Sequence, residues 1–363
     1  MKALLPYYPL FAFLAAFVIT YFSVPAIIRL SLVKKLYDQP DDRKKHASRI
    51  TPLGGIAIFG GLIIPFIFFS AHLINPTLNS VLVALFVLFI TGVKDDLYPL
   101  VPYKKLLGQI LAVGIVILQG DIRLERFYGL FGIWDLPFWV SVAISFIFFL
   151  GIINSFNFID GINGLSSSIG ILFSLVYAGW FYYLDQPLFL VLALCIAGSQ
   201  MAFLRYNLIN AKIFMGDSGS MILGFFGALL SIYFLQANER TSETVLLHID
   251  AVVFALSVLI IPIIDTLRVV FLRVFILKRS PFSADRNHIH HALLDIGLSH
   301  VSATAALFFS NVFLIAFTYF LNPYLRASYL LLSLSLLALA LSQVPFVIKK
   351  SRKKSSAATT PNI

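Results

Sequence analysis

Long apolar runs separated by short polar segments dominate the chain. Eleven runs lie at about residues 10–32, 54–70, 79–93, 106–118, 138–153, 165–183, 188–204, 213–235, 251–277, 302–321 and 327–348. A helix that crosses a bilayer needs about 20 mostly apolar residues, and most of these runs come close to that length. The run at 106–118 is the shortest. The pattern predicts an all-α polytopic membrane protein with about eleven transmembrane helices.

The overall composition agrees with this prediction. Of the 363 residues, 59% are hydrophobic and 12% are charged, whereas soluble domains average about 45–50% and about 25%. The net charge of +10 could suggest nucleic acid, but no soluble domain remains to carry such a surface. We therefore expect no nucleic-acid partner. The single cysteine, Cys195, excludes a disulfide framework and a cysteine-based metal site.

The basic residues indicate how the helices are oriented. If the N-terminus lies outside and the runs alternate, 22 of the 27 Lys and Arg residues fall on the inner side and five on the outer side. Such an excess of Lys and Arg marks cytoplasmic loops. We therefore expect the N-terminus outside and the C-terminus in the cytoplasm.

Acidic and amide residues gather in the predicted inner segments. Asp95 and Asp96 follow the third run, and two adjacent carboxylates can hold a cation or act as a base. Solvated charges at a helix end are an equally good explanation. Asn154, Asn157 and Asp160 are spaced by three, so a helix would place them on neighbouring turns. Hydrogen bonds between helices could explain the two Asn residues alone, but the added Asp160 favours a site.

Two further motifs suggest binding of phosphates. Residues 216–220 read Gly-Asp-Ser-Gly-Ser and open a long apolar run, where free N–H groups attract anions, although Asp217 or Ser218 could simply cap the helix. His288, His290 and His291 follow Arg286. Without a cysteine nearby, this group suits a diphosphate better than zinc.

Asp265 and Arg268 lie near the inner end of the ninth run, which could also be a span that breaks. A structural salt bridge and a role in the site are equally good explanations for this pair. Taken together, the inner segments offer oxygen ligands for Mg²⁺ and cations for phosphates. Phosphoryl transfer needs mainly such positioning and charge neutralisation, so the residues predict a magnesium-dependent phosphoryl transferase.

The motifs occur together in the order known from one family. Residues 94–96 (Lys-Asp-Asp), 154–161 (Asn-x-x-Asn-x-x-Asp-Gly), 215–220 (Met-Gly-Asp-Ser-Gly-Ser) and 288–291 (His-Ile-His-His) resemble the polyprenyl-phosphate N-acetylhexosamine-1-phosphate transferases. Residues 43–46 (Arg-Lys-Lys-His) and 51–55 (Thr-Pro-Leu-Gly-Gly) do so as well. The resemblance covers about residues 1–345. It is closest to the bacterial undecaprenyl-phosphate N-acetylglucosaminyl 1-phosphate transferases.

This resemblance implies an eleven-span enzyme of the bacterial inner membrane with its active site on the cytoplasmic face. Such an enzyme transfers an N-acetylhexosamine 1-phosphate from a UDP-sugar to undecaprenyl phosphate and releases UMP, the first membrane step of an envelope glycan. The expected cofactor is Mg²⁺, which Mn²⁺ could replace, and a homodimer is left open. Residues 1–350 would form a single integral membrane catalytic domain, followed by a disordered basic cytoplasmic tail at 351–363.

The resemblance also implies roles for individual residues. Asp217 and Asn157 would bind the metal. The catalytic group would comprise Asp95, Asp96, Asp160, His290 and His291. The substrates would be bound by Arg43, Lys44, His46, Lys105, Gly161, Asn163, Asn207, Phe214, Arg286 and His288.

Two departures from the family pattern bear on the substrate. Asn163 stands where the family usually has Asp, so a charge is lost at the turn expected to contact uracil. The His-Ile-His-His motif differs from the three consecutive His residues and acidic residue typical of the branch that uses UDP-MurNAc-pentapeptide. We therefore favour UDP-GlcNAc as the donor. The alternatives are another UDP-amino sugar or UDP-MurNAc-pentapeptide.

A membrane transporter is the rival explanation from another functional class. Transporters place polar groups near the bilayer midplane in paired repeats. In this chain the polar motifs gather on one predicted face, and no internal repeat is evident. The transferase explanation therefore accounts for more of the sequence.

Overall fold

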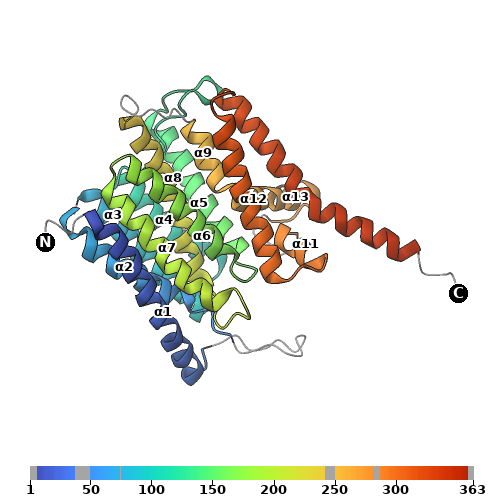
Figure 1. Ribbon diagram of the computed structural model, residues 1–363, viewed down its shortest axis with the longest axis horizontal. Coiled ribbons are helices and arrows are strands. Elements are labelled where there is room, and N and C mark those ends of the chain that lie inside the picture. Colours follow the sequence, from blue (N-terminus) through green and yellow to red (C-terminus); the bar gives the residue numbers. More distant parts are fainter. Residues whose placement is uncertain (1–5, 37–49, 74, 242–249, 281–286, 359–363) are drawn as a thin grey trace.

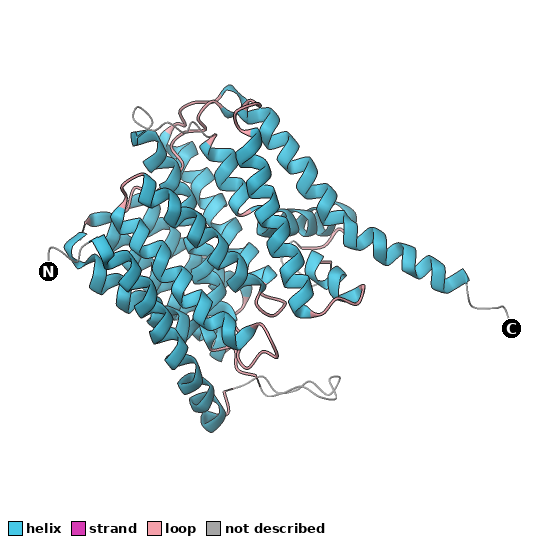
Figure 2. Cartoon of the chain, viewed as in Figure 1, coloured by secondary structure: helices cyan, strands magenta, loops and turns pink. Residues whose placement is uncertain are grey.

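The computed structural model describes residues 6–36, 50–73, 75–241, 250–280 and 287–358, and every regular element in these ranges is a helix (Figures 1 and 2). The first eight are α1 (Tyr8–Lys34), α2 (Gly54–Ser70), α3 (Pro76–Leu97), α4 (Pro102–Leu118), α5 (Phe138–Ile159), α6 (Leu165–Tyr183), α7 (Pro187–Asn207) and α8 (Gly216–Thr241). They are followed by α9 (Ala251–Val258), α10 (Ile260–Phe271), α11 (Ile289–Asp295), α12 (His300–Leu321) and α13 (Ala327–Ala358). Short 3₁₀ helices occupy 71–73 and 130–132, and a short π-helix occupies 272–276.

These helices confirm the all-α polytopic membrane architecture. Each of the eleven apolar runs coincides with helical structure, and nine helices of the described residues are long and apolar enough to cross a membrane. The bent pair α9–α10 makes a tenth if it is counted as one span. Helix α4 covers the short fourth run but has only 17 residues. The count of eleven therefore depends on α4 and on the bent pair.

Helix α8 forms the centre of the bundle. In its most apolar stretch 94% of the residues are buried, against 22% in α1 and in α13. Helices α2, α3, α5, α6 and α9 pack around it. Figure 1 shows α12 and α13 along one side of the bundle, with the end of α13 extending beyond it. The residues at the start of α8 are consequently surrounded by the ends of several other helices.

The helix pair α9–α10 bends by 77° at Leu259, and Pro262 provides a physical reason. A proline has no N–H to donate to the carbonyl four residues earlier, which here is Val258. Asn311 of α12 replaces the missing bonds: its Nδ2 donates to the Val258 carbonyl at 3.1 Å, and its Oδ1 accepts from Ile261 N at 3.2 Å. A break inside a membrane bundle is tolerated when its backbone groups find such partners.

Helix α13 continues to Ala358, into the segment for which the sequence predicts a disordered basic tail from Ser351. The disordered tail stays a prediction. Lys and Ala are strong helix formers, and α13 is anchored on both sides of Ser351. Lys349 Nζ lies 2.6 Å from Asp295 Oδ2, and Arg352 donates to the Ile296 carbonyl. The helix therefore supports α11 and the turn after it. Residues 359–363 lie outside the described residues.

The predicted inner segments meet at one end of the bundle. The end of α3 contacts the start of α8, the end of α5 contacts the same point, and Thr51 pairs with Ile213. The predicted outer segments meet at the opposite end, where Asp250 N donates to Asn322 and Phe131 N donates to Ser328. The polar motifs that fall within the described residues therefore share one end of the molecule.

Candidate active site

Close backbone packing fixes the first turn of α8. A Cβ atom added to Gly55 of α2 would lie 2.3 Å from Gly219 N, and one added to Gly92 of α3 would lie 2.3 Å from Ser218 Cα. Gly216 has φ of +72°, a conformation that glycine adopts without strain. Only glycine allows α2 and α3 to approach this turn so closely. The position of Asp217, the second residue of α8, is therefore set by its neighbours.

The N-terminus of α8 is capped by a residue from another helix. Asp96 of α3 accepts from Asp217 N at 2.6 Å through Oδ1, and its Oδ2 accepts from Ser218 N at 3.1 Å and Ser218 Oγ at 2.5 Å. A carboxylate at a helix N-terminus satisfies free N–H groups and is favoured by the helix dipole. Neither local capping residue suggested by the sequence is needed, so the Asp217 carboxylate can face its neighbours.

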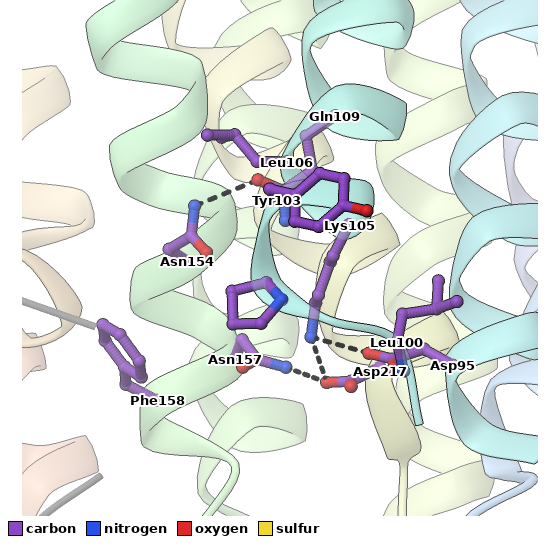
Figure 3. Close-up of a pocket in the computed structure, with 11 residues that line it drawn as sticks. Asp95, Leu100, Tyr103, Lys105, Leu106, Gln109, Asn154, Asn157, Phe158 and Asp217 are labelled. Carbon is purple, nitrogen blue, oxygen red and sulfur yellow. Dashed lines mark hydrogen bonds and ion pairs between the residues drawn. The ribbon is translucent and has the colours of Figure 1, made fainter. Parts of the chain in front are cut away.

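A lysine links two of the predicted acidic residues. Lys105, near the start of α4, lies 2.7 Å from Asp217 Oδ1 and 3.2 Å from Asp95 Oδ2 (Figure 3). Asn157 of α5 donates to the same oxygen of Asp217 and to Ser220 Oγ. The second oxygen of Asp95 accepts from Leu100 N at 2.6 Å. Four predicted site residues from four helices thus form one charged cluster.

This cluster forms one wall of a pocket of about 520 Å³. Its polar lining consists of Asp95, Lys105, Gln109, Asn154, Asn157 and Asp217, and its apolar lining of Leu100, Pro102, Tyr103, Leu106 and Phe158. Asn154 Nδ2 donates to Gln109 Oε1 at 3.1 Å, which ties α5 to α4 (Figure 3). The pocket therefore presents charged groups beside an apolar surface.

The turn between α5 and α6 is held by two other helices. Asn207 of α7 is buried, and its Oδ1 accepts from Gly164 N at 2.7 Å while its Nδ2 donates to the Ile213 carbonyl at 2.9 Å. The Asn163 carbonyl accepts from Thr304 Oγ1 at 2.9 Å. Burial raises the pKa of the Asp160 carboxyl well above its usual range. The backbone of this turn is therefore held in place by side chains of α7 and α12.

The histidine motif begins α11 and faces inward. His288 and His290 are 5% and 1% exposed. Burial lowers the pKa of His290 to about 3, so its ring is neutral at ordinary pH. A Cβ atom on Gly161 would lie 2.6 Å from His290 Nε2, which places the ring against the turn described above. The His291 ring lies 4.3 Å from that of His290. Among the described residues, no histidine lines the 520 Å³ pocket.

Asp265 of α10 lies close to His288 and His290. Asp265, His288 and His290 are buried and place three potential metal-ligating atoms within 4.8 Å of one another. The separation of Asp265 Oδ2 from His288 Nδ1 is 2.9 Å. Asp265 therefore contacts the histidine motif, and a role for it in the site stays a prediction.

The predicted site residues fall into two adjacent groups. The first contains Asp95, Asp96, Lys105, Asn157 and Asp217; the second contains Asp160, Gly161, Asn163, Asn207, His288, His290 and His291. Phe158 lines the pocket, and its ring centroid lies 5.5 Å from that of His288. Phe214 is 36% exposed, and its backbone binds Thr51 and Gly54. Arg43, Lys44, His46 and Arg286 lie outside the described residues.

Some residues of the site were not found from the sequence. Gln109 is fully buried in the fourth apolar run and lines the pocket, and Ser220 binds Asn157. A Gln in an otherwise apolar stretch was the available signal, because a buried amide needs a partner. The cap formed by Asp96 left no signal, since its partner lies 121 residues away.

Comparisons with known proteins identify a matching family and several relatives of this chain. The sequence profile of glycosyl transferase family 4 matches residues 78–235. A probable undecaprenyl-phosphate N-acetylglucosaminyl 1-phosphate transferase of Bacillus subtilis is 30% identical, over 80% of this chain and 78% of the relative. A decaprenyl-phosphate N-acetylglucosaminephosphotransferase of Mycobacterium leprae is 29% identical, over 85% and 83%. An undecaprenyl-phosphate alpha-N-acetylglucosaminyl 1-phosphate transferase of Salmonella typhi is 30% identical, over 73% and 70%.

Proposed function

The chain belongs to glycosyl transferase family 4, the polyprenyl-phosphate N-acetylhexosamine-1-phosphate transferases, and from this premise we propose its substrates. It is a multi-pass membrane sugar-phosphate transferase. We propose that it moves GlcNAc 1-phosphate from UDP-GlcNAc to undecaprenyl phosphate. An oxygen of the lipid phosphate attacks the β-phosphorus of the nucleotide sugar. The bond from that phosphorus to the bridging oxygen breaks, and UMP leaves with the electron pair.

The observation that carries the proposal is the cluster of Lys105, Asp95, Asp217 and Asn157 beside an apolar pocket wall. A reaction between a charged nucleotide sugar and a lipid phosphate needs both kinds of surface at one place. The apolar lining from Tyr103 and Leu106 suits the first isoprene units of the lipid. On the outside of α4, Leu107 and Leu111 are about 60% exposed and continue this apolar surface toward the bilayer.

The donor atoms of the cluster fit Mg²⁺. This ion prefers carboxylate and other oxygen ligands and is usually shared with substrate phosphates. Asp217 and Asn157 would hold it, with Mn²⁺ as a substitute. When bound, the ion would neutralise charge on the transferring phosphate. Lys105 would turn from the carboxylates to a phosphate, because its flexible ammonium is a mobile point charge.

The two adjacent carboxylates divide their tasks in this proposal. Asp95 lines the pocket, so it would orient the lipid phosphate or accept its proton. Both oxygens of Asp96 are used at the start of α8, which favours a role in positioning Asp217. Catalytic roles for Asp160, His290 and His291 stay predictions, as does the binding of phosphates by Arg286.

We further propose that this end of the bundle faces the cytoplasm of a bacterial inner membrane. The excess of Lys and Arg in the segments at this end supports the orientation. A reporter fused after Ile363 should then report the cytoplasm, and one inserted at Asn238 should report the outside. Reporters on the same side would contradict the orientation. Residues 1–350 would act as one catalytic domain.

The experiment for the donor is UMP release by the purified protein in lipid nanodiscs with undecaprenyl phosphate and Mg²⁺. We expect turnover with UDP-GlcNAc. If the protein turns over UDP-MurNAc-pentapeptide but not UDP-GlcNAc, the proposed donor is wrong and the proposed sugar-phosphate transfer still holds. Release of no UMP from any UDP-amino sugar, together with substrate uptake into sealed vesicles, would favour the transporter.

A further inference from the structure

We propose that Asp265 is a positioning residue for the histidine motif, and that its carboxylate holds the His288 ring in the tautomer protonated on Nδ1. This inference rests on the proposed function, because the histidine motif is expected to handle the substrate phosphates. Asp265 itself does not line the pocket. It would act through the ring that it orients.

Each carboxylate oxygen of Asp265 has a hydrogen-bond partner. Oδ2 lies 2.9 Å from His288 Nδ1, and Oδ1 accepts from Ile289 N at 2.8 Å. Only 2% of Asp265 is exposed. Because a carboxylate oxygen accepts hydrogen bonds, as Oδ1 does from Ile289 N, we assign the proton of the bond to Oδ2 to His288 Nδ1. Nε2 is left to accept a hydrogen bond, or to donate one once the ring is charged.

A second residue of α10 holds the same segment. Arg268, one turn after Asp265, donates to the Asn287 carbonyl at 2.6 Å, and its guanidinium lies 3.6 Å from the centre of the Phe346 ring. Residues 287–289 are therefore bound at three consecutive positions by one short helix. The bend at Leu259 sets the direction of that helix, so this arrangement depends on the break in the span.

A metal bound by Asp265, His288 and His290 would be the alternative use of these side chains. The arrangement favours hydrogen bonding, because both Asp265 oxygens already accept and His290 Nδ1 lies 3.9 Å from Oδ2. Arg273 is also buried nearby, with its guanidinium 5.6 Å from the Phe158 ring that neighbours His288. A dication would add charge beside an existing buried cation.

The orientation of His288 bears on the pocket through Phe158. That ring lines the pocket and lies 5.5 Å from the His288 ring. Residue His290, two positions on, rests against Gly161. A rotated His288 would therefore change both the wall of the pocket and the turn beside it.

The functional test is a double-mutant cycle on UMP release with Asp265→Asn, His288→Gln and the double variant. At metal sites, removing the group that orients a histidine ring typically costs about 10–100-fold. We expect each single variant to lose at least about tenfold in kcat/KM, and the double variant to lose no more than the worse single one. Losses that multiply would show independent roles and overturn the proposal. Asp135→Asn is the control: this carboxylate is 72% exposed and pairs with Arg126 at the opposite end of the bundle, so its loss should leave kcat/KM unchanged.

The structural test needs no substrate and no change at Asp265. In ¹⁵N-histidine NMR of the wild-type protein, the His288 signal is the one absent from His288→Gln. We expect a proton on its Nδ1, and a proton on Nε2 alone would overturn the proposal. Stoichiometric binding of Zn²⁺ by the wild type that is lost in Asp265→Asn would also overturn it. If the tautomer is as expected but UDP-GlcNAc is not used, only the proposed function fails.

Discussion

Replacing Asp96 by Asn separates two roles that the sequence alone could not distinguish. The wild-type carboxylate accepts from Asp217 N on one oxygen and from Ser218 N and Oγ on the other. An amide has one oxygen, so its Nδ2 must face one of these backbone N–H groups. The variant keeps the shape of the side chain and removes an acceptor and a charge from the start of α8.

The expected loss of stability can be estimated from these bonds. A buried N–H left without an acceptor costs about 1–3 kcal/mol. Loss of a negative charge at a helix N-terminus adds about 0.3–1 kcal/mol. We therefore expect Asp96→Asn to lower the free energy of unfolding by about 1–4 kcal/mol. Ser218→Ala removes only the hydroxyl bond and should cost about 0.5–1.5 kcal/mol.

The assay is equilibrium unfolding by SDS in mixed micelles, followed by circular dichroism without substrate. Asp135→Asn is the matched control, because its carboxylate is 72% exposed and pairs with Arg126 at the opposite end; an exposed pair contributes about 0–1 kcal/mol. If Asp96 acts only as a base, its variant should unfold like this control. Such a result would refute the assignment of Asp96 as the cap of α8.

Three further predictions address the packing, the turn and the histidines. Gly92→Ala should unfold far more easily than Gly60→Ala under the same assay, because its Cβ would meet the α8 backbone at 2.3 Å whereas Gly60 has no heavy atom within 4 Å. Asn163→Asp should mainly change KM for the nucleotide sugar in steady-state UMP release; a fall in kcat alone would place this residue in the chemistry. The pKa of His290 is lowered to about 3, below its unfolded value of 6.5. The unfolded chain therefore binds the proton first as pH falls, and stability should drop by about 2 kcal/mol from pH 7.5 to 5. His290→Gln should abolish that drop, and an unchanged drop would contradict the assignment.

The sequence predicted the features that depend on local patterns. Apolar runs located the helices because a bilayer requires every span to be apolar over its length. The spacing of Asn154 and Asn157 placed them on one helix, and the Gly-Asp-Ser-Gly-Ser segment was correctly expected to begin another. The start of α8 could be predicted because it depends on a local feature, the glycine with positive φ at position 216.

Features that depend on packing between distant helices were not predictable in this way. Asp96 caps α8 across 121 residues, and Gln109 pairs with Asn154 across 45. The contact between Asp265 and His288 likewise depended on where the bend at Leu259 directed α10. Side-chain type limits which bonds are possible, but the packing of the bundle decides which partners meet.

The central claim is that Asp217 holds the metal for transfer of a sugar phosphate. The most direct measurement is UMP release from UDP-GlcNAc across a Mg²⁺ titration, for wild type, Asp217→Asn and the control Asp135→Asn. Loss of one strong electrostatic stabiliser costs about 10²–10³-fold, so we expect Asp217→Asn to lose at least about 10²-fold and to need more Mg²⁺. The control should match the wild type. Near-normal turnover of Asp217→Asn at ordinary Mg²⁺ would contradict the account.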